Sequence, residues 1–357
     1  MTAGKIVFRT DASTSLGMGH LYRSLALASA FATHGYTISF VVKNVSLAAL
    51  DILRGYEVLQ LAKRMSWDEE NVALESAFGN KQYDIILDVS HAITFRFLNQ
   101  FSAYTKSLGQ VFEKRIIIDG FANTALLEKV EISAEMAITP YVGAKNRSLV
   151  SQGFIHLTGP KYMIFDSSYR VATALRKVAA EGARILLTFG GSDPMRISLM
   201  ALEACDTLNE RVEVRVVAGR GFDKELVESI KIKCAAMGKC KIIHSPSTLV
   251  DHMLWADIAV SASGLTKYEL ALCGTPAVLI SVDNEHAAIN HIFDSAGTSV
   301  DMGVFSDVTV SNLASAISGL LSNRIQRESL AQAGQALVDA FGTERIVSAV
   351  RALHVGD

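Results

Sequence analysis

The residues best suited to chemistry lie in a long loop near the N-terminus. The loop runs Thr10-Asp-Ala-Ser-Thr-Ser-Leu-Gly-Met-Gly19 and leads to His20, at the start of an expected helix. It is longer than the roughly 2–6 residues usual between a strand and a helix, which favours a functional loop. Because an imidazole titrates near neutral pH, we predict that His20 is a general base. The competing interpretation is that His20 only caps the helix.

Glycines flank this histidine on its N-terminal side. Gly17 and Gly19 allow the backbone to approach a ligand closely, and the amides that open the helix favour an anion. Of the nine histidines, His20 is the best placed for catalysis. The loop is not the dinucleotide-binding fingerprint, because Tyr22 occupies the third glycine position. A nicotinamide-dependent enzyme is therefore disfavoured.

Carboxylates follow apolar, strand-like runs in the same half of the chain. Two such runs end at Asp88 and Asp119, and Asp11 lies in the first loop. The carboxyl ends of parallel strands face one crevice, so these acids can orient His20 or bind sugar amides and hydroxyls. Strand-end aspartates also cap helices, and we weigh the two interpretations equally. We predict that Asp11 is the partner of His20.

A glycine turn follows the first apolar run of the second half. The run 185–189 leads into Gly190-Gly191-Ser192-Asp193-Pro194, which predicts a turn, a cap residue and a proline in the first helical position. Free amides and the positive helix end then favour a pyrophosphate. The alternative is a tight turn without a ligand.

A second turn of this kind follows the run 257–263. It begins at Gly264, continues as Gly264-Leu265-Thr266 and opens another helix. Thr266 and Glu269 have the spacing of a capping box, which would give Glu269 a purely structural role. The functional alternative is that the Glu269 carboxylate accepts both hydroxyls of a ribose.

These candidate residues require strands and helices that alternate along the chain. Short apolar runs without polar alternation, separated by helical patterns, indicate parallel strands covered on both faces. The predicted strands centre on residues 6–8, 38–42, 85–87, 116–118 and 137–138, and then on 185–189, 214–217, 242–244, 258–260 and 277–280. Helices are expected at 169–180, 311–321, 324–340 and 344–353. The fold class is therefore α/β, with two doubly wound, Rossmann-like domains.

The length and composition support two domains. The chain has 357 residues, half of them hydrophobic, which is enough for two cores. We place the domains at 1–175, carrying the catalytic and sugar site, and at 176–357, carrying the nucleotide site. The last helix is a segment that can pack back on the first domain. With only five prolines and no low-complexity tract, the domains are joined compactly and the ligand is expected between them.

Charge and cysteine content exclude several classes of partner. With 34 basic and 36 acidic residues the net charge is −2, so nucleic acid is not an expected partner. No apolar run approaches the roughly 20 residues that span a membrane, and no export signal precedes the first strand. The four cysteines show no regular framework and are interpreted as free core thiols, which suits the cytoplasm. No metal site or cofactor is expected, and a monomer is favoured.

The order of these motifs resembles a known family. The stretch from Arg9 to Arg23, the turn Gly190 to Asp193 and the segment Ser261 to Glu269 resemble the UDP-sugar hydrolase of pseudaminic acid biosynthesis and the spore-coat polysaccharide (SpsG-like) proteins. This family has the glycosyltransferase B (GT-B) fold, with a central cleft, and is related to the MurG transferase of peptidoglycan synthesis. The match covers nearly the whole chain in motif order.

The resemblance implies a reaction and a set of site residues. Water activated by His20 would attack the anomeric carbon of a UDP-linked deoxy-diacetamido sugar and expel UDP with inversion, and no metal would take part. The implied catalytic group is His20, Asp11 and Ser90. The implied substrate-binding residues are Arg9, Gly17, Gly19, Arg23, Asp88, Asp119, Asn284 and Glu285. The implied nucleotide-binding residues are Gly190, Gly191, Ser192, Ser263, Gly264, Leu265, Thr266 and Glu269.

The sequence also departs from the family pattern. Val89 and Ser90 follow Asp88 where the family has a histidine and a tyrosine, and Gly120 replaces a second acid. Glu285 stands where a glutamine is usual, and its negative charge changes which sugar fits. Three functions stay open: the hydrolase, a transferase that passes the sugar to an acceptor hydroxyl, and a nucleotide-sugar-binding protein without activity.

Overall fold

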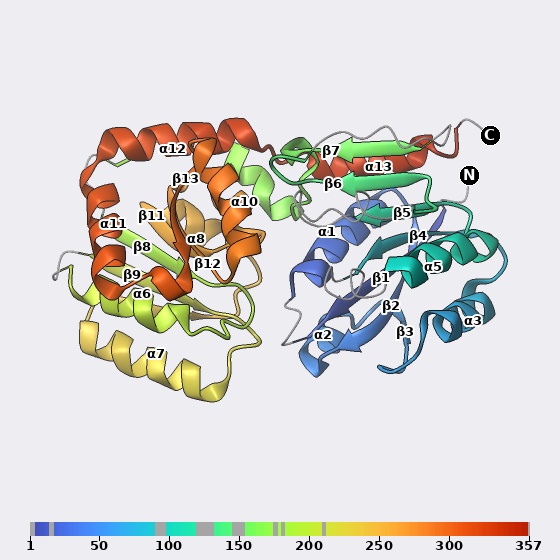
Figure 1. The fold of residues 1–357 in the computed structure, drawn as a ribbon, viewed down its shortest axis with the longest axis horizontal. Coiled ribbons are helices and arrows are strands. Elements are labelled where there is room, and N and C mark those ends of the chain that lie inside the picture. Colours follow the sequence, from blue (N-terminus) through green and yellow to red (C-terminus); the bar gives the residue numbers. More distant parts are fainter. Residues whose placement is uncertain are drawn as a thin grey trace. The chain divides into compact units, whose positions relative to one another are not determined.

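The chain folds into two compact units (Figure 1). The computed structural model describes residues 4–13, 18–89, 98–118, 132–144, 154–173, 178–179, 183–208 and 212–355. Unit 1 comprises Met1–Asp166 and Phe341–Asp357, and unit 2 comprises Ser167–Ala340. The division therefore falls at Asp166 and not near residue 175, and the last helix belongs to unit 1.

Unit 1 contains a seven-stranded parallel sheet. The strand order is β3-β2-β1-β4-β5-β6-β7. The strands are β1 (Lys5–Ala12), β2 (Thr37–Val45), β3 (Glu57–Gln60), β4 (Tyr83–Asp88), β5 (Arg115–Ile118), β6 (Met136–Thr139) and β7 (Ile155–Thr158). Each neighbouring pair is parallel. The order reverses between β1 and β4, which is where doubly wound sheets bind ligands.

Helices cover both faces of this sheet. They are α1 (Gly19–Thr33), α2 (Leu47–Ile52), α3 (Trp67–Phe78), α5 (Leu98–Val111), the short 3-10 helix η2 (Pro160–Tyr162) and α13 (Gly342–Ala352). One core joins apolar residues of α1 and α13 to the sheet, and a second core lies under α3 and α5. Strands that are buried on both faces must be apolar throughout, which is why their sequence does not alternate.

Unit 2 repeats the architecture with six parallel strands in the order β10-β9-β8-β11-β12-β13. The strands are β8 (Arg184–Thr188), β9 (Glu213–Ala218), β10 (Cys240–His244), β11 (Ile258–Ala262), β12 (Ala277–Ser281) and β13 (Ser299–Val304). The helices are η3 (Ser167–Thr173), α6 (Ile197–Asp206), α7 (Lys224–Met237), α8 (Val250–Trp255), α9 (Thr266–Leu272), α10 (Asn284–Ser295), η4 (Phe305–Asp307), α11 (Val310–Ser322) and α12 (Arg324–Leu337). The order reverses between β8 and β11.

The prediction of two doubly wound parallel sheets is confirmed, and every predicted strand is present. The described residues also contain three strands that the sequence did not predict, namely β3, β7 and β13. All three lie at an edge of a sheet. Edge strands are partly exposed and carry polar residues, so they lack the continuous apolar run that marks an interior strand. The helix expected at 169–180 is instead a 3-10 segment as far as Thr173.

The interpretation of all four cysteines as free thiols is wrong for two of them. Cys205 and Cys273 are buried thiols outside any disulfide, as expected, but Cys234 and Cys240 form a disulfide. The sequence argument for a reducing compartment therefore does not hold for this pair. No helix among the described residues has both the length and the apolar character needed to cross a membrane.

Candidate functional site

The best-formed catalytic geometry in unit 1 is a histidine held by an aspartate at the switch point of the sheet. Strand register places Thr10 of β1 beside Asp88, the last residue of β4. His20 is the second residue of α1, and its Nδ1 lies 2.7 Å from Oδ1 of Asp88. The histidine side chain is 24% exposed and the aspartate is fully buried. The imidazole therefore reaches solvent while its partner does not.

Asp88 is held as a carboxylate by Arg23, one turn further along α1. Arg23 Nε donates to Asp88 Oδ2 at 2.8 Å, and its Nη2 donates to Oδ1. The remaining Nη1 of Arg23 donates to the hydroxyl of Tyr141. Burial opposes ionisation of Asp88, but the positive charges of Arg23 and His20 outweigh it and lower the pKa of Asp88 to about 2.

This arrangement sets the tautomer of His20. A carboxylate accepts hydrogen bonds and donates none, so Nδ1 of His20 is the donor to Asp88. In the neutral ring Nε2 then carries the lone pair, and a nitrogen in this state accepts a proton from an attacking oxygen. A buried carboxylate in this position can also stabilise a protonated imidazole, which is the role of the aspartate in a catalytic triad.

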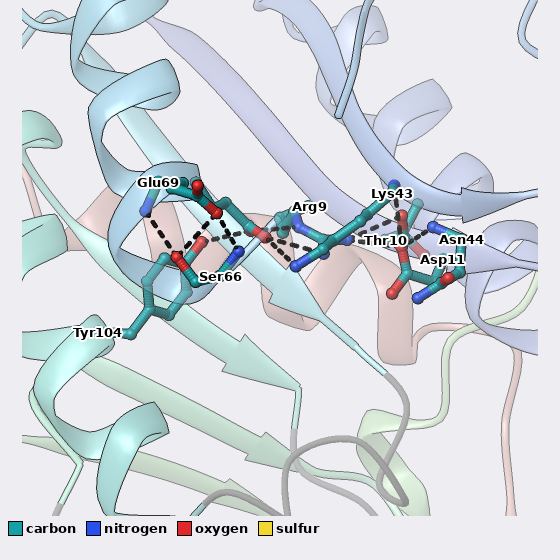
Figure 2. A network of polar contacts seen from close by, with 9 residues as sticks. Arg9, Thr10, Asp11, Lys43, Asn44, Ser66, Glu69 and Tyr104 are labelled. Carbon is teal, nitrogen blue, oxygen red and sulfur yellow. Dashed lines mark hydrogen bonds and ion pairs between the residues drawn. The ribbon is translucent and has the colours of Figure 1, made fainter. Parts of the chain in front are cut away.

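Asp11 is not the partner of His20, so this prediction was wrong. Asp11 Oδ1 accepts from Arg9 Nη1 at 2.7 Å and from the backbone amides of Lys43 and Asn44 at 3.1 and 3.0 Å (Figure 2). Burial opposes ionisation, but Arg9 and these amides outweigh it and lower the pKa of Asp11. Its carboxylate ties the end of β1 to the end of β2.

Arg9, expected to bind substrate, is also used internally. Its side chain is 1% exposed, and Nε donates to Oε1 of Glu70 at 2.6 Å. Glu70 is fully buried and also accepts from Tyr104 Oη at 2.8 Å and Lys43 Nζ at 3.3 Å. The charges of Arg9 and Lys43 balance those of Asp11 and Glu70. Arg9 therefore stabilises the strand ends and offers no atom to a ligand in this arrangement.

The other predicted residues of unit 1 divide into three groups. Arg23 and Asp88 are buried and hold His20, so they are corrected from substrate contacts to positioning residues. Gly19 is exposed as the first residue of α1. Three further predicted residues, Gly17, Ser90 and Asp119, lie outside the described residues.

In unit 2 the first glycine turn follows β8 at the switch point. Gly190 has a φ of +75°, a conformation that favours glycine. The Gly191 carbonyl accepts from the Gly221 amide at 2.8 Å, and a Cβ on Gly219 would lie 2.5 Å from that carbonyl oxygen. Two loops therefore pack backbone to backbone. Among the described residues, the amides of Gly191 and Ser192 donate to no acceptor and are free for an anion.

The helix after this turn does not offer its own amides, contrary to the prediction. Asp193 accepts from the amides of Ile197 and Ser198, both at 2.9 Å. Helix α6 begins at Ile197, so Pro194 lies before the helix and not in its first position. An anion at this turn would contact the turn amides, because a carboxylate already occupies the end of the helix.

The second turn connects β11 to α9 and has no capping box. Helix α9 begins at Thr266, with Leu265 as its N-cap and no side-chain cap. The capping-box interpretation of Thr266 and Glu269 is therefore wrong, since Thr266 is inside the helix and is not its N-cap. Gly264 is exposed, and the amides of Gly264 and Leu265 donate to no acceptor in the described part of the chain.

Asn284 and Glu285 open helix α10 after β12. Both are exposed, and Asp283 caps the helix by accepting from the His286 amide at 2.8 Å. His286 Nδ1 also lies 2.7 Å from Asp283. Asn284 and Glu285 lie at the carboxyl ends of the strands, as the two glycine turns do. Each of these three segments directly follows a parallel strand of the same sheet.

One cluster among the described residues has the composition of a metal site. It contains Asp84, Glu113 and His354. His354 Nε2 lies 2.8 Å from Asp84, and its Nδ1 lies 3.4 Å from Glu113. The two nitrogens point to different carboxylates, as in a hydrogen-bonded bridge. Asp84 lies near the start of β4, whereas Asp88, the partner of His20, lies at its end. The cluster is therefore at the amino ends of the strands, and His20 is at their carboxyl ends.

Several known proteins resemble this chain in sequence. No protein-family model matches it. It is 25% identical over 196 residues to the spore coat polysaccharide biosynthesis protein SpsG of Bacillus subtilis, covering 55% of this chain and 58% of that protein. A relative from Methanocaldococcus jannaschii is 24% identical, and the match covers 55% of it. The chain thus spans little more than half the length of these relatives.

Solved structures agree over almost the full length. MurG of Acinetobacter baumannii superposes with a TM-score of 0.65 at 15% identity, covering 98% of this chain and 99% of that one. The S. aureus MnaA–UDP structure has a TM-score of 0.60 at 14% identity, covering 98% and 96%. The chain therefore has the two Rossmann-like units of the glycosyltransferase B fold, as the resemblance implied.

Proposed function

We propose that this protein is a metal-independent enzyme that transfers a sugar from UDP to an acceptor hydroxyl, as in the synthesis of surface polysaccharides. The observation that carries the proposal is the His20–Asp88 pair, with its buried carboxylate and its solvent-accessible imidazole. The fold and the relatives support a nucleotide-sugar substrate, since one relative is a polysaccharide biosynthesis protein and the MnaA structure contains UDP.

The proposed reaction is a single displacement. Nε2 of His20 removes the proton from the acceptor hydroxyl while the acceptor oxygen bonds to the anomeric carbon. The bond from that carbon to the diphosphate oxygen breaks, UDP leaves with the electron pair, and the configuration inverts. Proton removal by a positioned base contributes about 10²–10⁴-fold in rate. Asp88 stabilises the imidazolium during this step.

The proposed nucleotide site is built on unit 2. The free turn amides of Gly191 and Ser192 and of Gly264 and Leu265 would bind the diphosphate, and Ser263 and Thr266 flank the second turn. Glu269, which is not part of a capping box, would accept the ribose hydroxyls. Asn284 and Glu285 would contact the sugar. These donors would stabilise the leaving group without a metal ion.

Hydrolysis is the second candidate, and the N-terminal motif favours it. The stretch from Arg9 to Arg23 resembles the pseudaminic acid hydrolase, in which water replaces the acceptor. The same base would serve either reaction. A chain that binds UDP without turning over any donor would instead support the binding protein without activity.

A UDP-release assay separates these functions. Deoxy-diacetamido UDP-sugars and common UDP-hexoses are supplied with and without sugar acceptors, and free UDP is measured. Release that requires an acceptor supports the transferase, and equal release without one supports the hydrolase. His20→Ala should abolish release and retain UDP binding, with His34→Ala, an exposed histidine at the end of α1, as the matched control. Near-normal turnover in His20→Ala would refute the assigned base.

A further inference from the structure

A buried polar cluster lies beneath the connection from β11 to α9. Lys267 Nζ donates to Oδ1 of Asn290 at 2.8 Å. Asn290 Nδ2 donates to Oγ of Ser263 at 3.0 Å and to Oγ of Ser281 at 2.8 Å. All four side chains are buried. The cluster joins the carboxyl ends of β11 and β12 to helices α9 and α10.

The hydrogen bonds in this cluster have a fixed direction. An ammonium group only donates, so the oxygen of the Asn290 amide must face Lys267 and its nitrogen must face the two serines. Ser263 then donates its own proton to the carbonyl of Ile280 at 3.3 Å. The orientation of Ser263, the residue before Gly264, therefore depends on a lysine that has no access to solvent.

Two aromatic rings flank the buried ammonium group of Lys267. Its ammonium lies 5.7 Å from the centre of the Tyr268 ring on α9 and 5.6 Å from that of Phe293 on α10. Burial lowers the pKa of Lys267 to about 7, and the charged group that opposes this effect is Asp301 on β13. The lysine thus changes charge close to neutral pH.

We propose that Lys267 is a positioning residue for the nucleotide site. Its ammonium form, acting through Asn290, holds the Ser263–Leu265 connection in the conformation that binds the diphosphate of a nucleotide. This inference rests on the proposed function, because it assumes that the connection contacts the diphosphate. The two can still fail separately, since UDP can bind without any contribution from Lys267.

The inference has a consequence for affinity. A bound diphosphate favours the ammonium form, so binding raises the pKa of Lys267 and the protein takes up a proton. Affinity must then fall as pH rises. If binding raises this pKa by one unit, the dissociation constant of UDP increases about fivefold between pH 7 and pH 9. The terminal phosphate, with a second pKa of about 6, is largely ionised throughout this range.

Calorimetric titration of the full chain with UDP tests the inference. Lys267→Met keeps the length of the side chain and removes the charge. We expect about fivefold weaker binding than wild type at pH 7 and no change between pH 7 and pH 9. The control is Lys231→Met, on the surface helix α7, where the lysine is exposed and pairs only loosely with Glu228 at 3.4 Å. This variant should behave as wild type.

The outcomes separate the two claims. If wild-type protein binds no UDP at either pH, the proposed function fails and this inference fails with it. If wild type binds UDP but Lys267→Met has the same affinity and the same pH dependence, only the positioning role is refuted. If the variant does not fold, proton uptake by the wild-type protein still tests the inference. Titrations at pH 8 in buffers of different ionisation enthalpy should show proton uptake, and no uptake would refute the inference.

Discussion

Asp88 is the residue on which the orientation of the candidate base depends. It is fully buried, and its oxygens accept from His20 and from Arg23. Asparagine has nearly the same shape, but its amide nitrogen would donate where the carboxylate accepts. In Asp88→Asn the ring of His20 is free to adopt the other tautomer, in which Nε2 carries the proton and cannot accept one.

Asp88→Asn should therefore lower the turnover number by about 10²–10⁴-fold. UDP affinity should not change, because the substitution is in unit 1 and the proposed nucleotide site is in unit 2. Steady-state UDP release and calorimetric UDP binding measure the two effects. Asp51→Asn, at an exposed position on α2, is the control. A loss of UDP affinity equal to the loss of turnover would show that Asp88 acts on the whole fold.

The same carboxylate should make stability depend on pH. The pKa of Asp88 is about 2 in the folded chain and about 3.9 when unfolded, so ionisation favours the folded state. This stabilisation, about 2–3 kcal/mol, is complete above pH 4–5 and is lost as pH falls through 2. Denaturant unfolding of wild type and Asp88→Asn should give stability curves that converge on acidification. Parallel curves between pH 7 and pH 2.5 would contradict the assignment.

At the scale of elements, the loops after β8 and β9 in unit 2 can pack together only because Gly219 has no side chain. Gly219 leaves no room for a Cβ, because the nearest neighbours are backbone carbonyls of the loop after β8. Backbone atoms cannot rotate away as the end of a side chain can. A methyl group at this position must therefore push the loop after β9 away from the Gly190–Ser192 turn.

Gly219→Ala should destabilise unit 2 by about 1–3 kcal/mol and weaken UDP binding. The control is Gly319→Ala, in the exposed interior of α11, where no atom lies within 4 Å of the added Cβ. That variant should be neutral or about 0.5–1 kcal/mol more stable, because alanine favours the helix. Thermal unfolding and UDP titration measure both effects. If the two variants behave alike, close packing of the loops does not shape the site.

The sequence predicted the interior strands well, but it did not predict which side chains pair with each other. Apolar runs such as 185–189 mark strands that are buried on both faces, whereas β3 and β13 are partly exposed and lack such a run. His20 and Asp88 were both identified, but their pairing depends on β4 lying beside β1, which no local pattern reveals. Glu70 was missed because it follows Asp68 and Glu69, and only the helical phase buries the third acid.

At the scale of the molecule, helix α13 completes unit 1 although it is the last element of the chain. Ile346, Val347 and Val350 are fully buried in the core that also contains residues of α1. Ile346→Ala should cost about 2–4 kcal/mol of stability. Calorimetry should show a lower unfolding temperature for unit 1 and little change for unit 2. Ile325→Ala, at an exposed position on α12, is the control and should have little effect.

The return of α13 also constrains the order in which the protein can be made. Unit 2 is a continuous segment, but unit 1 consists of residues 1–166 together with residues 341–357. A nascent chain leaving the ribosome therefore exposes the apolar surface of α1 until residues 341–357 have been translated. The usual order, in which the N-terminal domain folds first, would be reversed. We expect synthesis of this protein to need chaperone protection of its first half until α13 has been made.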